Sequence, residues 1–503
     1  MNTMTTSLRD SSPYVSYAYG YPHKTAYRAL DPSISLADVW RDEDTRALFG
    51  YVHIPFCEMR CGFCNLFTAA QPPAQLVGAY LDALERHGEA VNEAIPEKQF
   101  ARYAIGGGTP TYLELNELER LFSLLHGLGI DTNNLPGSVE TSPDTATDER
   151  LSFLRETGVS RISMGVQSFF EAESKAMGRP QRPDHLKAAL ERLKAAAFPV
   201  LNLDLIYGAD GQTPQRFVES IDQALDWAPE ELYLYPLYIR PLTGLAKQGR
   251  AWDDQRLASY RAGRERLLSA GYEQVSMRMF RKPGDSMDDG PAYCCQQDGM
   301  VGLGCGARSY TRALHYSSDY AVGRSSVREI IADYGHPDRD HGVVSHGFHL
   351  SRDEQARRYV ISSLLQVTGL SKADYQQTFG MAPEENVVEL QHLAEIDFAQ
   401  CEGGRASRSR AWKCRMPSVP TWVLRPSRNC LRRTNGSRPV CSLSRLAGQL
   451  QLWLLVLSLR QAGRFTRRAG PRSGGLAALF GLGRGGRLSR VDTLHAVGRS
   501  PGA

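Results

Sequence analysis

The sequence predicts an α/β protein built around a partial (β/α)6 barrel, followed by a smaller helical domain and an anomalous basic tail. Two observations carry this prediction. From residue 48 to about residue 240, short β-rich apolar runs alternate with helical patterns, which is typical of repeated βαβ units and a parallel sheet. Polar and glycine-rich motifs fall at or just beyond the ends of the expected strands, where function collects in α/β barrels.

The elements follow in a regular order. Strands are expected at the β-rich apolar runs 48–54, 101–105, 138–141, 161–167, 200–208 and 231–239. Helices are expected between them, near 74–94, 114–128, 146–157, 183–197 and 214–227. Beyond the barrel, helical spacing recurs at 256–272, 352–366, 370–380 and 385–396, and 301–310 is a glycine-rich turn.

These patterns divide the chain into five parts. Residues 1–47 form a Tyr-rich N-terminal arm that we expect to lie extended on a larger body. Residues 48–240 form the barrel core, and residues 241–350 complete the barrel. Residues 351–400 form a small helical domain that stops abruptly and that we interpret as truncated. Residues 401–503 form an Arg-rich tail.

The net charge of +4 conceals two regions of opposite sign. Residues 401–503 hold 19 Arg and one Lys against Glu402 and Asp492, whereas residues 1–400 hold 39 basic and 53 acidic residues. A basic arm that binds nucleic acid normally mixes Lys with Arg, and this tail lacks both that mixture and an amphipathic period. We interpret the segment after about Gln400 as a frameshift product of a GC-rich coding region. Nucleic-acid binding is the less favoured alternative.

The composition is that of an ordinary globular chain. With 42% hydrophobic and 23% charged residues, a wholly disordered, collagen-like or disulfide-rich protein is excluded. The apolar run Leu452–Leu457 is far shorter than the roughly 20 residues that a membrane span needs. The first residues lack the apolar segment of a signal peptide. We therefore expect a cytoplasmic protein with no membrane partner.

Three cysteines, Cys57, Cys61 and Cys64, lie within one short loop. Disulfides are disfavoured in the cytosol, so a tight triplet indicates metal or redox chemistry. Three thiolates at this spacing can bind three irons of a cubane cluster and leave the fourth iron open for a small molecule. A zinc site without its fourth ligand and three unrelated cysteines are the alternatives. The position of the loop after the first strand, followed by GGGTP after the second, favours the cluster.

Five motifs occur in order over about residues 51–240: YVHIPFCEMRCGFCNL, IGGGTPTYL, SVETSPD, SRISMGVQSF and NLDLIYG. Together they resemble the radical S-adenosylmethionine (SAM) superfamily, and within it the branch of oxygen-independent coproporphyrinogen III oxidases and haem chaperones. The resemblance implies two cofactors, a [4Fe–4S] cluster and SAM. It also implies that one electron from the cluster cleaves SAM to methionine and a 5′-deoxyadenosyl radical, while the protein orients the cofactors and excludes water.

The resemblance also implies roles for individual residues. The cluster ligands are Cys57, Cys61 and Cys64. The SAM contacts are Tyr51, Phe63, Gly107, Gly108, Thr109, Glu140, Gln167, Arg179 and Asp204. Among these, glycines let the backbone approach the ligand, a guanidinium suits a carboxylate, and the acidic side chains accept hydrogen bonds. The alternatives are a simple turn for the glycines, core packing for Phe63 and Tyr51, and surface positions for Glu140 and Arg179. No residue is assigned to catalysis.

The chain departs from this branch at two points. The oxidase has a further cysteine two residues after the third ligand, where this chain has Leu66. The haem chaperones have a His-Asn signature ahead of a Tyr-Trp pair, and residues 291–310 contain no histidine. A second cysteine group is expected to be buried free thiols rather than ligands of a second metal; it comprises Cys294, Cys295 and Cys305. A histidine group is expected in a solvated loop rather than at haem or metal; it comprises His336, His341, His346 and His349.

We therefore expect a radical SAM iron–sulfur oxidoreductase that resembles oxygen-independent coproporphyrinogen III oxidase. Its expected partners are a small-molecule substrate of the porphyrin type and an electron donor such as flavodoxin or ferredoxin. The alternative is a haem-binding chaperone that keeps the cluster and the SAM site without oxidase activity. An RNA-binding protein that works through the basic tail is the third hypothesis, and the specific barrel motifs favour the first two.

Overall fold

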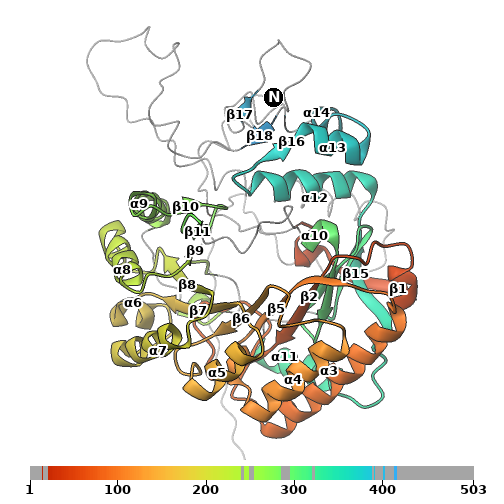
Figure 1. Cartoon of the computed structure of the whole chain (residues 1–503), viewed down its shortest axis with the longest axis horizontal. Helices are drawn as coiled ribbons and strands as arrows, with labels where there is room; N and C mark the ends of the chain where they lie inside the picture. Colours follow the sequence, from red (N-terminus) through yellow and green to blue (C-terminus); the bar gives the residue numbers. More distant parts are fainter. Residues whose placement is uncertain are drawn as a thin grey trace, which may run out of the picture. The chain divides into compact units, whose positions relative to one another are not determined.

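The computed structural model describes residues 14, 21–239, 243–248, 254–284, 295–319, 323–387, 390, 400–402 and 413–415. At its centre lies a curved parallel sheet whose strands run in the order of the sequence (Figure 1). These strands are β2 (Leu48–Ile54), β5 (Phe100–Gly107), β6 (Gly137–Thr141), β7 (Arg161–Gln167), β8 (Val200–Tyr207) and β9 (Glu231–Pro236). Every neighbouring pair is parallel. The six strands predicted from the sequence are confirmed, and so is the α/β fold class.

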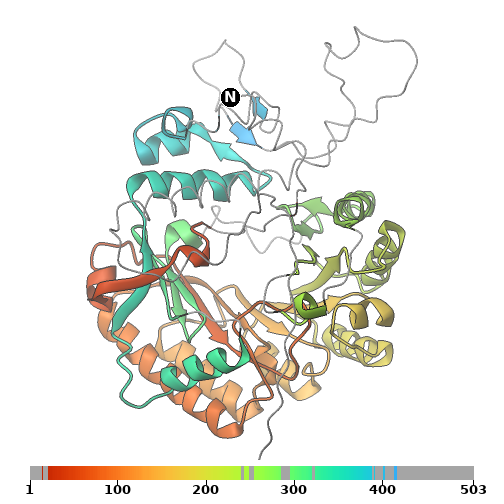
Figure 2. The same ribbon diagram turned by 180° about the vertical axis from the view of Figure 1, so that it is seen from behind.

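Helices connect successive parallel strands and cover the outer side of the sheet (Figures 1 and 2). They are α3 (Ala74–Ala94), α4 (Leu115–Gly127), α5 (Asp148–Glu156), α7 (Pro183–Ala196) and α8 (Pro214–Asp226). Local sequence explains where they begin. Thr147 and Thr213 cap α5 and α8 by accepting from a backbone N–H in the first turn. Glu114 and Glu117 form a capping box at α4.

The remaining sheet strands extend both ends of the parallel core. β12 (Met300–Leu303) lies parallel to β2. Beyond it, antiparallel strands follow in the order β13 (Arg308–Tyr310), β14 (Leu314–Ser317), β15 (Val343–His349) and β1 (Arg28–Ser35). At the other end, β11 (Met279–Arg281) and β10 (Glu273–Gln274) follow β9. Within the described residues, β1 and β10 are the sheet's two edges, so the barrel is not closed by strand pairing.

Several expectations for these flanking regions need correction. The expected glycine-rich turn at 301–310 contains strands β12 and β13, because Gly302 and Gly304 keep the backbone close to neighbouring strands where a side chain would clash. The expected solvated histidine loop ends in strand β15, which carries His346 and His349. The N-terminal arm is more than an extended segment, since its described part contains β1 and α2 (Leu36–Trp40), with Leu36 and Trp40 buried.

The other described elements are short or lie outside the barrel core. The helices are α6 (Glu171–Ala176), α9 (Arg256–Ser269), α10 (Cys295–Asp298), α11 (Arg324–Tyr334), α12 (Arg352–Leu364), α13 (Lys372–Phe379) and α14 (Pro383–Asn386). The 3-10 turns are η1 (Lys24–Ala26), η2 (Pro110–Tyr112) and η3 (Leu245–Gln248). The short strands are β3 (Phe56–Cys57), β4 (Ala69–Ala70), β16 (Leu370–Ser371), β17 (Gln400–Glu402) and β18 (Lys413–Arg415).

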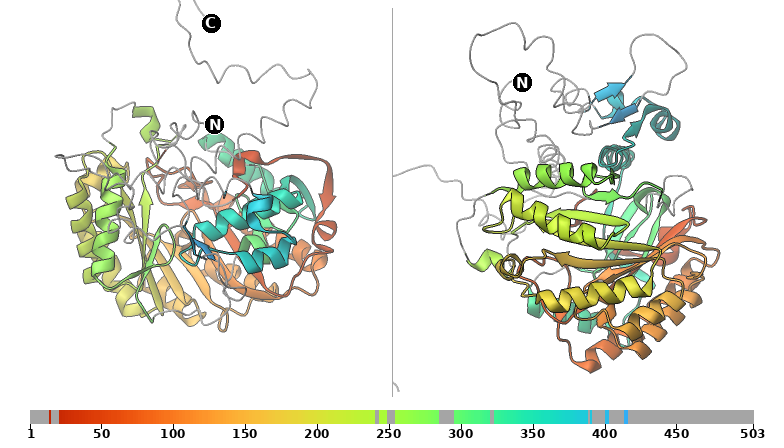
Figure 3. Two further views of the ribbon diagram at one scale, coloured as in Figure 1. Left: turned by 90° about the horizontal axis from the view of Figure 1, so that it is seen from above. Right: turned by 60° about the vertical axis from the view of Figure 1, so that its left-hand side comes forward.

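Helix α12 bridges the two antiparallel ends of the sheet. On one side, Arg358 donates to the carbonyl of Thr311 (3.2 Å) and to Nε2 of His315 (2.8 Å), next to and on β14. On the other side, the residues just after α12 pair with the segment between β10 and β11, through the bridge Ser276–Gln366 and the bond from Val367 N–H to Val275 (3.1 Å). Figures 1 and 3 show α12 with α13 and α14 above it.

The small C-terminal domain contains α12, α13, α14 and a three-stranded sheet in the order β16-β18-β17. This sheet extends past the expected boundary at residue 400, since β17 reaches Glu402 and β18 pairs with both neighbours. The helix expected at 385–396 is described only as far as Asn386 in α14 and at the single residue 390. Apart from β17 and β18, the residues to which the frameshift hypothesis applies lie outside the part of the chain that the structure describes.

The main apolar core lies between the sheet and its helices. Its residues come from strand positions such as Leu48, Ile105, Val139 and Leu203 and from the inward faces of the covering helices, and all four of these side chains are essentially inaccessible to water. Across the described residues, we find no helix with both the length and the apolar character needed to cross a bilayer.

Candidate functional site

The cysteine loop lies at the carboxyl end of β2 and is fixed to the end of the next strand. Its first strand, β3, pairs with β4. The backbone N–H of Gly108 donates to the carbonyl of Ile54 (2.7 Å), and that of Thr109 donates to Phe56 (2.8 Å). A side chain at Gly108 would bring its Cβ within 2.5 Å of the Phe56 oxygen and 2.9 Å of the Cys57 sulfur. The loop therefore needs glycine at position 108.

The middle of the cysteine loop is held from the opposite side. The N–H of Gly62 donates to the carbonyl of Gly178 (3.0 Å), and the carbonyl of Gly62 accepts from Leu245 (2.9 Å). A Cβ on Gly62 would lie 2.8 Å from the Met177 oxygen. Cys61 and Cys64 flank this glycine, so two distant loops determine where their sulfurs lie.

Three half-buried free thiols result from this arrangement: Cys57, Cys61 and Cys64. Burial raises the pKa of Cys57 well above its usual range and the pKa of Cys61 to about 11, and the charge of Arg179 opposes the shift at Cys61. Because metals bind thiolates, loading this loop must release protons.

The donor set fits a cubane cluster, because a cubane binds each thiolate to a different iron. Three thiols in one loop supply the ligands of three irons and no fourth.

Two acidic side chains, Glu140 on β6 and Asp204 on β8, lie near enough for the charge of Asp204 to affect Glu140. Glu140 ends in a carboxylate that accepts from the N–H of Gly107 (3.2 Å) and lies against Gly106. Protein surrounds it, and this desolvation together with the charge of Asp204 raises the pKa of Glu140 to about 7. Although protein atoms surround the carboxylate, the Glu140 residue is exposed to solvent rather than part of the packed core.

The Asp204 carboxylate has more stabilising hydrogen-bond and charge partners nearby than the Glu140 carboxylate. Its Oδ1 accepts from Nδ2 of Asn202 (2.7 Å). Burial raises its pKa to about 6, and this shift is opposed by the Asn202 bond and by the charges of Arg161, Arg278 and Arg179. The register pairs Asp204 with Gly165 on β7 and with Tyr233 on β9.

Gln167 and Arg179 come together over Gly165. A Cβ on Gly165 would lie 2.5 Å from Nε2 of Gln167 and 3.1 Å from Nη1 of Arg179. Gln167 ends β7 with a left-handed backbone (φ 68°), which turns its side chain back over the strand. Arg179 is 9% exposed, which contradicts the alternative of a surface arginine.

Tyr51 and Phe63 lie at opposite sides of this site. Tyr51 on β2 contacts Nδ1 of His53 (3.3 Å), and the His53 ring occupies the space that a Cβ on Gly107 (φ 112°) would need. Phe63 packs, together with Tyr235, against a separate apolar cluster formed by Met177, Ile206, Ala209, Leu237 and Leu245. That cluster is a suitable neighbour for a flat, weakly polar ring.

Ten of the twelve residues singled out in the sequence lie near the carboxyl ends of β5, β6 and β7 or in the loops that follow β2, β5 and β7, whereas Tyr51 and Asp204 lie in the middle of β2 and β8. Direct contacts join Cys57 to Gly108, Gly107 to Glu140, and Gln167 to Arg179 through their shared approach to Gly165. Tyr51 lies next to His53, and Phe63 packs against the apolar cluster.

Sequence reasoning missed two residues of the site. Asn202 is fully buried, donates to Ser163 (2.6 Å) and Asp204, and keeps a buried Oδ1 that no protein group satisfies. Its position two residues before Asp204 on one strand puts both side chains on the same face, so this alternation could have identified it. Tyr235, two residues after Tyr233 on β9, had no comparable signal.

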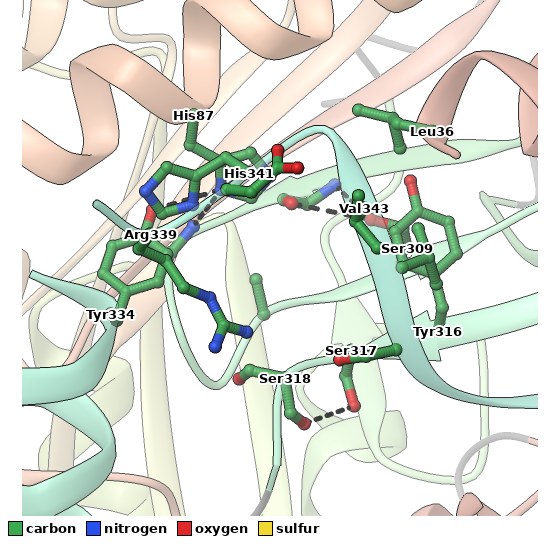
Figure 4. A pocket seen from close by; sticks show the side chains of 16 residues that line it. Leu36, His87, Ser309, Tyr316, Ser317, Ser318, Tyr334, Arg339, His341 and Val343 are labelled. Carbon is green, nitrogen blue, oxygen red and sulfur yellow. Dashed lines mark hydrogen bonds between the residues drawn. The ribbon is translucent and has the colours of Figure 1, made fainter. Parts of the chain in front are cut away.

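Of the other cysteines and histidines singled out in the sequence, the structure describes Cys305, His336, His341, His346 and His349. Cys305 is buried and unpaired, and burial raises its thiol pKa, while the side chains of Cys294 and Cys295 lie outside the described residues. Figure 4 shows a pocket lined by residues of α3, α11, β15 and the strands β12–β14, where His341 stacks on His87 with ring centroids 5.2 Å apart. Burial lowers the pKa of both rings, to about 4 and about 3.

These observations define an α/β barrel protein: its curved parallel sheet carries three thiols in the loop after β2, with acidic, amide and guanidinium groups on the neighbouring strands and loops. Residues 51–224 match the family model of the radical SAM superfamily. The heme chaperone HemW of Bacillus subtilis is 30% identical over 346 residues, which cover 66% of this chain and 86% of that protein. The chain belongs to the radical SAM superfamily, in the branch of heme chaperones and oxygen-independent coproporphyrinogen III oxidases.

Two oxidases show the same relationship. The oxygen-independent coproporphyrinogen III oxidase of Pseudomonas aeruginosa is 28% identical over 355 residues, which cover 66% of this chain and 74% of that enzyme. The solved structure of coproporphyrinogen III oxidase (HemN) from Escherichia coli matches with a TM-score of 0.67 and 25% identity over 80% of this chain and 94% of that chain. The barrel, the flanking strands and the C-terminal domain therefore belong to one known fold.

Proposed function

We propose that this chain is a radical SAM enzyme that holds a [4Fe–4S] cluster on Cys57, Cys61 and Cys64 and binds SAM beside it. One observation carries the proposal: the backbone that fixes the cysteine loop, at Gly108 and Thr109, is continuous with Gly107, whose N–H reaches the carboxylate of Glu140. A ligand that touches the loop would also lie within reach of that carboxylate.

When bound, the cluster supplies the electron that cleaves SAM and so generates a 5′-deoxyadenosyl radical. The residues of this chain bind and orient. Arg179 would pair with the carboxylate of SAM as a charge-assisted donor. Asp204 and Glu140 would accept from its ammonium or ribose groups, and a cation between them would lower the pKa of both carboxyls. Phe63 and its apolar neighbours would pack against adenine and exclude water.

For the substrate, we propose a porphyrin-type molecule, with an electron donor such as flavodoxin or ferredoxin. The support is the activity named for the oxidases of Pseudomonas aeruginosa and Escherichia coli. A haem-binding chaperone is the second candidate. It is favoured by Leu66, which is 46% exposed at the position where the oxidase has a cysteine, and by the similarity to the heme chaperone.

Anaerobic reconstitution with iron and sulfide tests the enzyme. The wild type should take up iron, show the visible absorbance of a thiolate-ligated cluster, and release 5′-deoxyadenosine on reduction, faster with a suitable porphyrinogen. Cys57→Ala, Cys61→Ala and Cys64→Ala should each lose the cluster absorbance, while the matched control Cys305→Ala keeps it. Full iron in all three loop variants would show that the ligands are elsewhere.

The same preparation separates the two candidate functions. An enzyme should convert SAM to 5′-deoxyadenosine. A carrier should bind the cluster, SAM and haem and yield no 5′-deoxyadenosine with any porphyrinogen. Because Leu66 replaces the additional cysteine, we expect coproporphyrinogen III itself to be a poor substrate, and rapid decarboxylation of it would contradict this expectation.

A further inference from the structure

A buried polar network lies directly behind Arg179, in the loops that follow β7 and β8. Glu173, on the short helix α6, is 6% exposed, and Gln212 is 3% exposed. Oε2 of Glu173 accepts from the Ser168 hydroxyl (2.6 Å) and from Nε2 of Gln212 (2.8 Å). These contacts involve none of the residues assigned above to the cluster or to SAM.

Each member of the network fixes backbone in one of the two loops. Ser168 also accepts from the N–H of Phe170 (3.1 Å), which shapes the turn that leads into α6. Oε1 of Gln212 accepts from the N–H of Gly208 (2.6 Å) in the turn after β8. The Glu173–Gln212 bond therefore joins the loop after β7 to the loop after β8.

The loop after β7 ends at the site itself. Backbone bonds continue from α6, with the N–H of Met177 donating to Glu173 (2.9 Å) and that of Arg179 donating to Ser174 (2.9 Å). Gly178, between them, accepts from Gly62 in the middle of the cysteine loop (3.0 Å). One end of the loop is thus anchored at the Glu173–Gln212 bond, and the other presents both Arg179 and the contact to the cysteine loop.

A buried carboxylate is costly unless it is well satisfied. Oε1 of Glu173 has no hydrogen-bond partner among the described residues, and the guanidinium of Arg216 approaches it only to 3.9 Å. An apolar residue could anchor this loop by packing, so a buried acid with two directional bonds is better explained by the need to fix a geometry.

We infer that Glu173 and Gln212 are positioning residues, which set Arg179 and Gly178 relative to the cysteine loop and so determine the affinity for SAM. The inference rests on the proposed function. Removing the bond would let the loop after β7 shift by small amounts. Arg179 would then bind the SAM carboxylate less well, whereas the thiols, which belong to another loop, would still bind iron.

The test measures SAM affinity at equilibrium on the reconstituted protein, together with iron content and thermal unfolding. Gln212→Leu keeps the volume and removes the bond to Glu173 together with the side-chain bonds to the backbone of Gly208, Ala209 and Ile206. It should weaken SAM binding about tenfold, since the bond to Glu173 is a hydrogen bond to a buried charged group. The KM for SAM should rise more than kcat falls. Glu173→Gln should stay within about twofold of the wild type, because one amide oxygen can accept both bonds.

Ser168→Ala and Ser160→Ala form a matched pair at the two ends of β7. Both hydroxyls are buried, and Ser160 bonds only to the backbone of Gly137 at the amino end. Ser168→Ala should weaken SAM binding about threefold by loosening the same loop. Ser160→Ala should lower the melting temperature and leave the affinity unchanged. If Gln212→Leu does not fold, this pair still decides the matter.

Wild-type affinity in both Gln212→Leu and Ser168→Ala would overturn the inference. An equal loss of affinity in Ser168→Ala and Ser160→Ala would also overturn it, since that result reports general destabilisation. If the wild type takes up neither iron nor SAM, the proposed function fails and this inference fails with it. That result is distinguishable, because it appears before any variant is made.

Discussion

At the scale of single residues, the two carboxylates of the site differ in how they are held. Asp204 has a fixed donor in Asn202 and three guanidinium groups nearby. Glu140 has one backbone donor, Gly107, and the like charge of Asp204 nearby. Without a ligand, the charged form of Glu140 is therefore less stabilised than that of Asp204, and a pH-dependent measurement can detect this difference.

We expect Glu140→Gln to stabilise the ligand-free protein at pH 8 and to change its stability little at pH 5. The pKa of Glu140 is raised to about 7 in the folded chain, against about 4.3 for an unfolded Glu. A raised carboxyl pKa means that the folded state holds the proton more tightly. The free energy of unfolding therefore falls as the pH rises from the pKa of Glu140 in the unfolded chain to its pKa in the folded chain. Melting temperatures at both pH values provide the measurement.

The control for this prediction is Glu119→Gln on the exposed face of α4, which should show no such pH dependence. A Glu140→Gln protein that is less stable than the wild type at pH 8 would show that the carboxylate makes a net favourable interaction in the empty site.

At the scale of elements, the site is assembled by loops that touch where a side chain is missing. Gly108 packs on the first turn of the cysteine loop, Gly62 packs on Gly178, and Gly165 lies under Gln167 and Arg179. At each place a Cβ would enter the space of a neighbouring atom, and at Gly108 and Gly62 the nearest atom belongs to the backbone. Glycine here sets the distance between elements rather than the flexibility of one.

Gly108→Ala should therefore displace the cysteine loop and reduce iron loading by more than half. Its Cβ would lie 2.5 Å from the oxygen of Phe56 and 2.9 Å from the Cys57 sulfur, distances at which one of them must move. Gly127→Ala is the matched control, since its Cβ meets nothing within 4 Å at the end of α4. Iron per chain after reconstitution, compared with the melting temperature, distinguishes a local displacement from unfolding.

The sequence was sufficient for elements with a strong period and insufficient for those fixed by distant contacts. Strands β2 and β7 have the predicted bounds, because apolar runs between turn residues mark them clearly. β12 and β15 were missed, since glycines and histidines hide their period and their pairing with β2, β13, β14 or β1 stabilises them. Strand ends similarly located Glu140 and Asp204, whereas Tyr235 depends on packing against Leu237 and its neighbours.

At the scale of the whole chain, the described structure ends at Arg415, inside the Arg-rich tail of residues 401–503. The last described strand, β18 (Lys413–Arg415), still pairs with β16 of the C-terminal domain. We therefore expect a chain ending at Arg415 to keep the iron loading and the melting temperature of the full-length protein, because the frameshift hypothesis gives residues 416–503 no part in the fold. Loss of iron or of solubility in the shortened chain would contradict that hypothesis.

Helix α12 and the residues that follow it contact both antiparallel ends of the sheet, and the sheet's described strands do not pair between these ends. Mechanically, the α12 segment holds the two ends of the open sheet together. We expect the amide protons of β14 and β11, which are far apart in sequence, to exchange with solvent through one shared opening event. Arg358→Ala removes the buried guanidinium that links α12 to His315, a contact worth about 2 kcal/mol. This variant should accelerate amide exchange in both strands by a similar factor. Acceleration confined to β14 would mean that the α12 segment does not couple the two ends of the sheet.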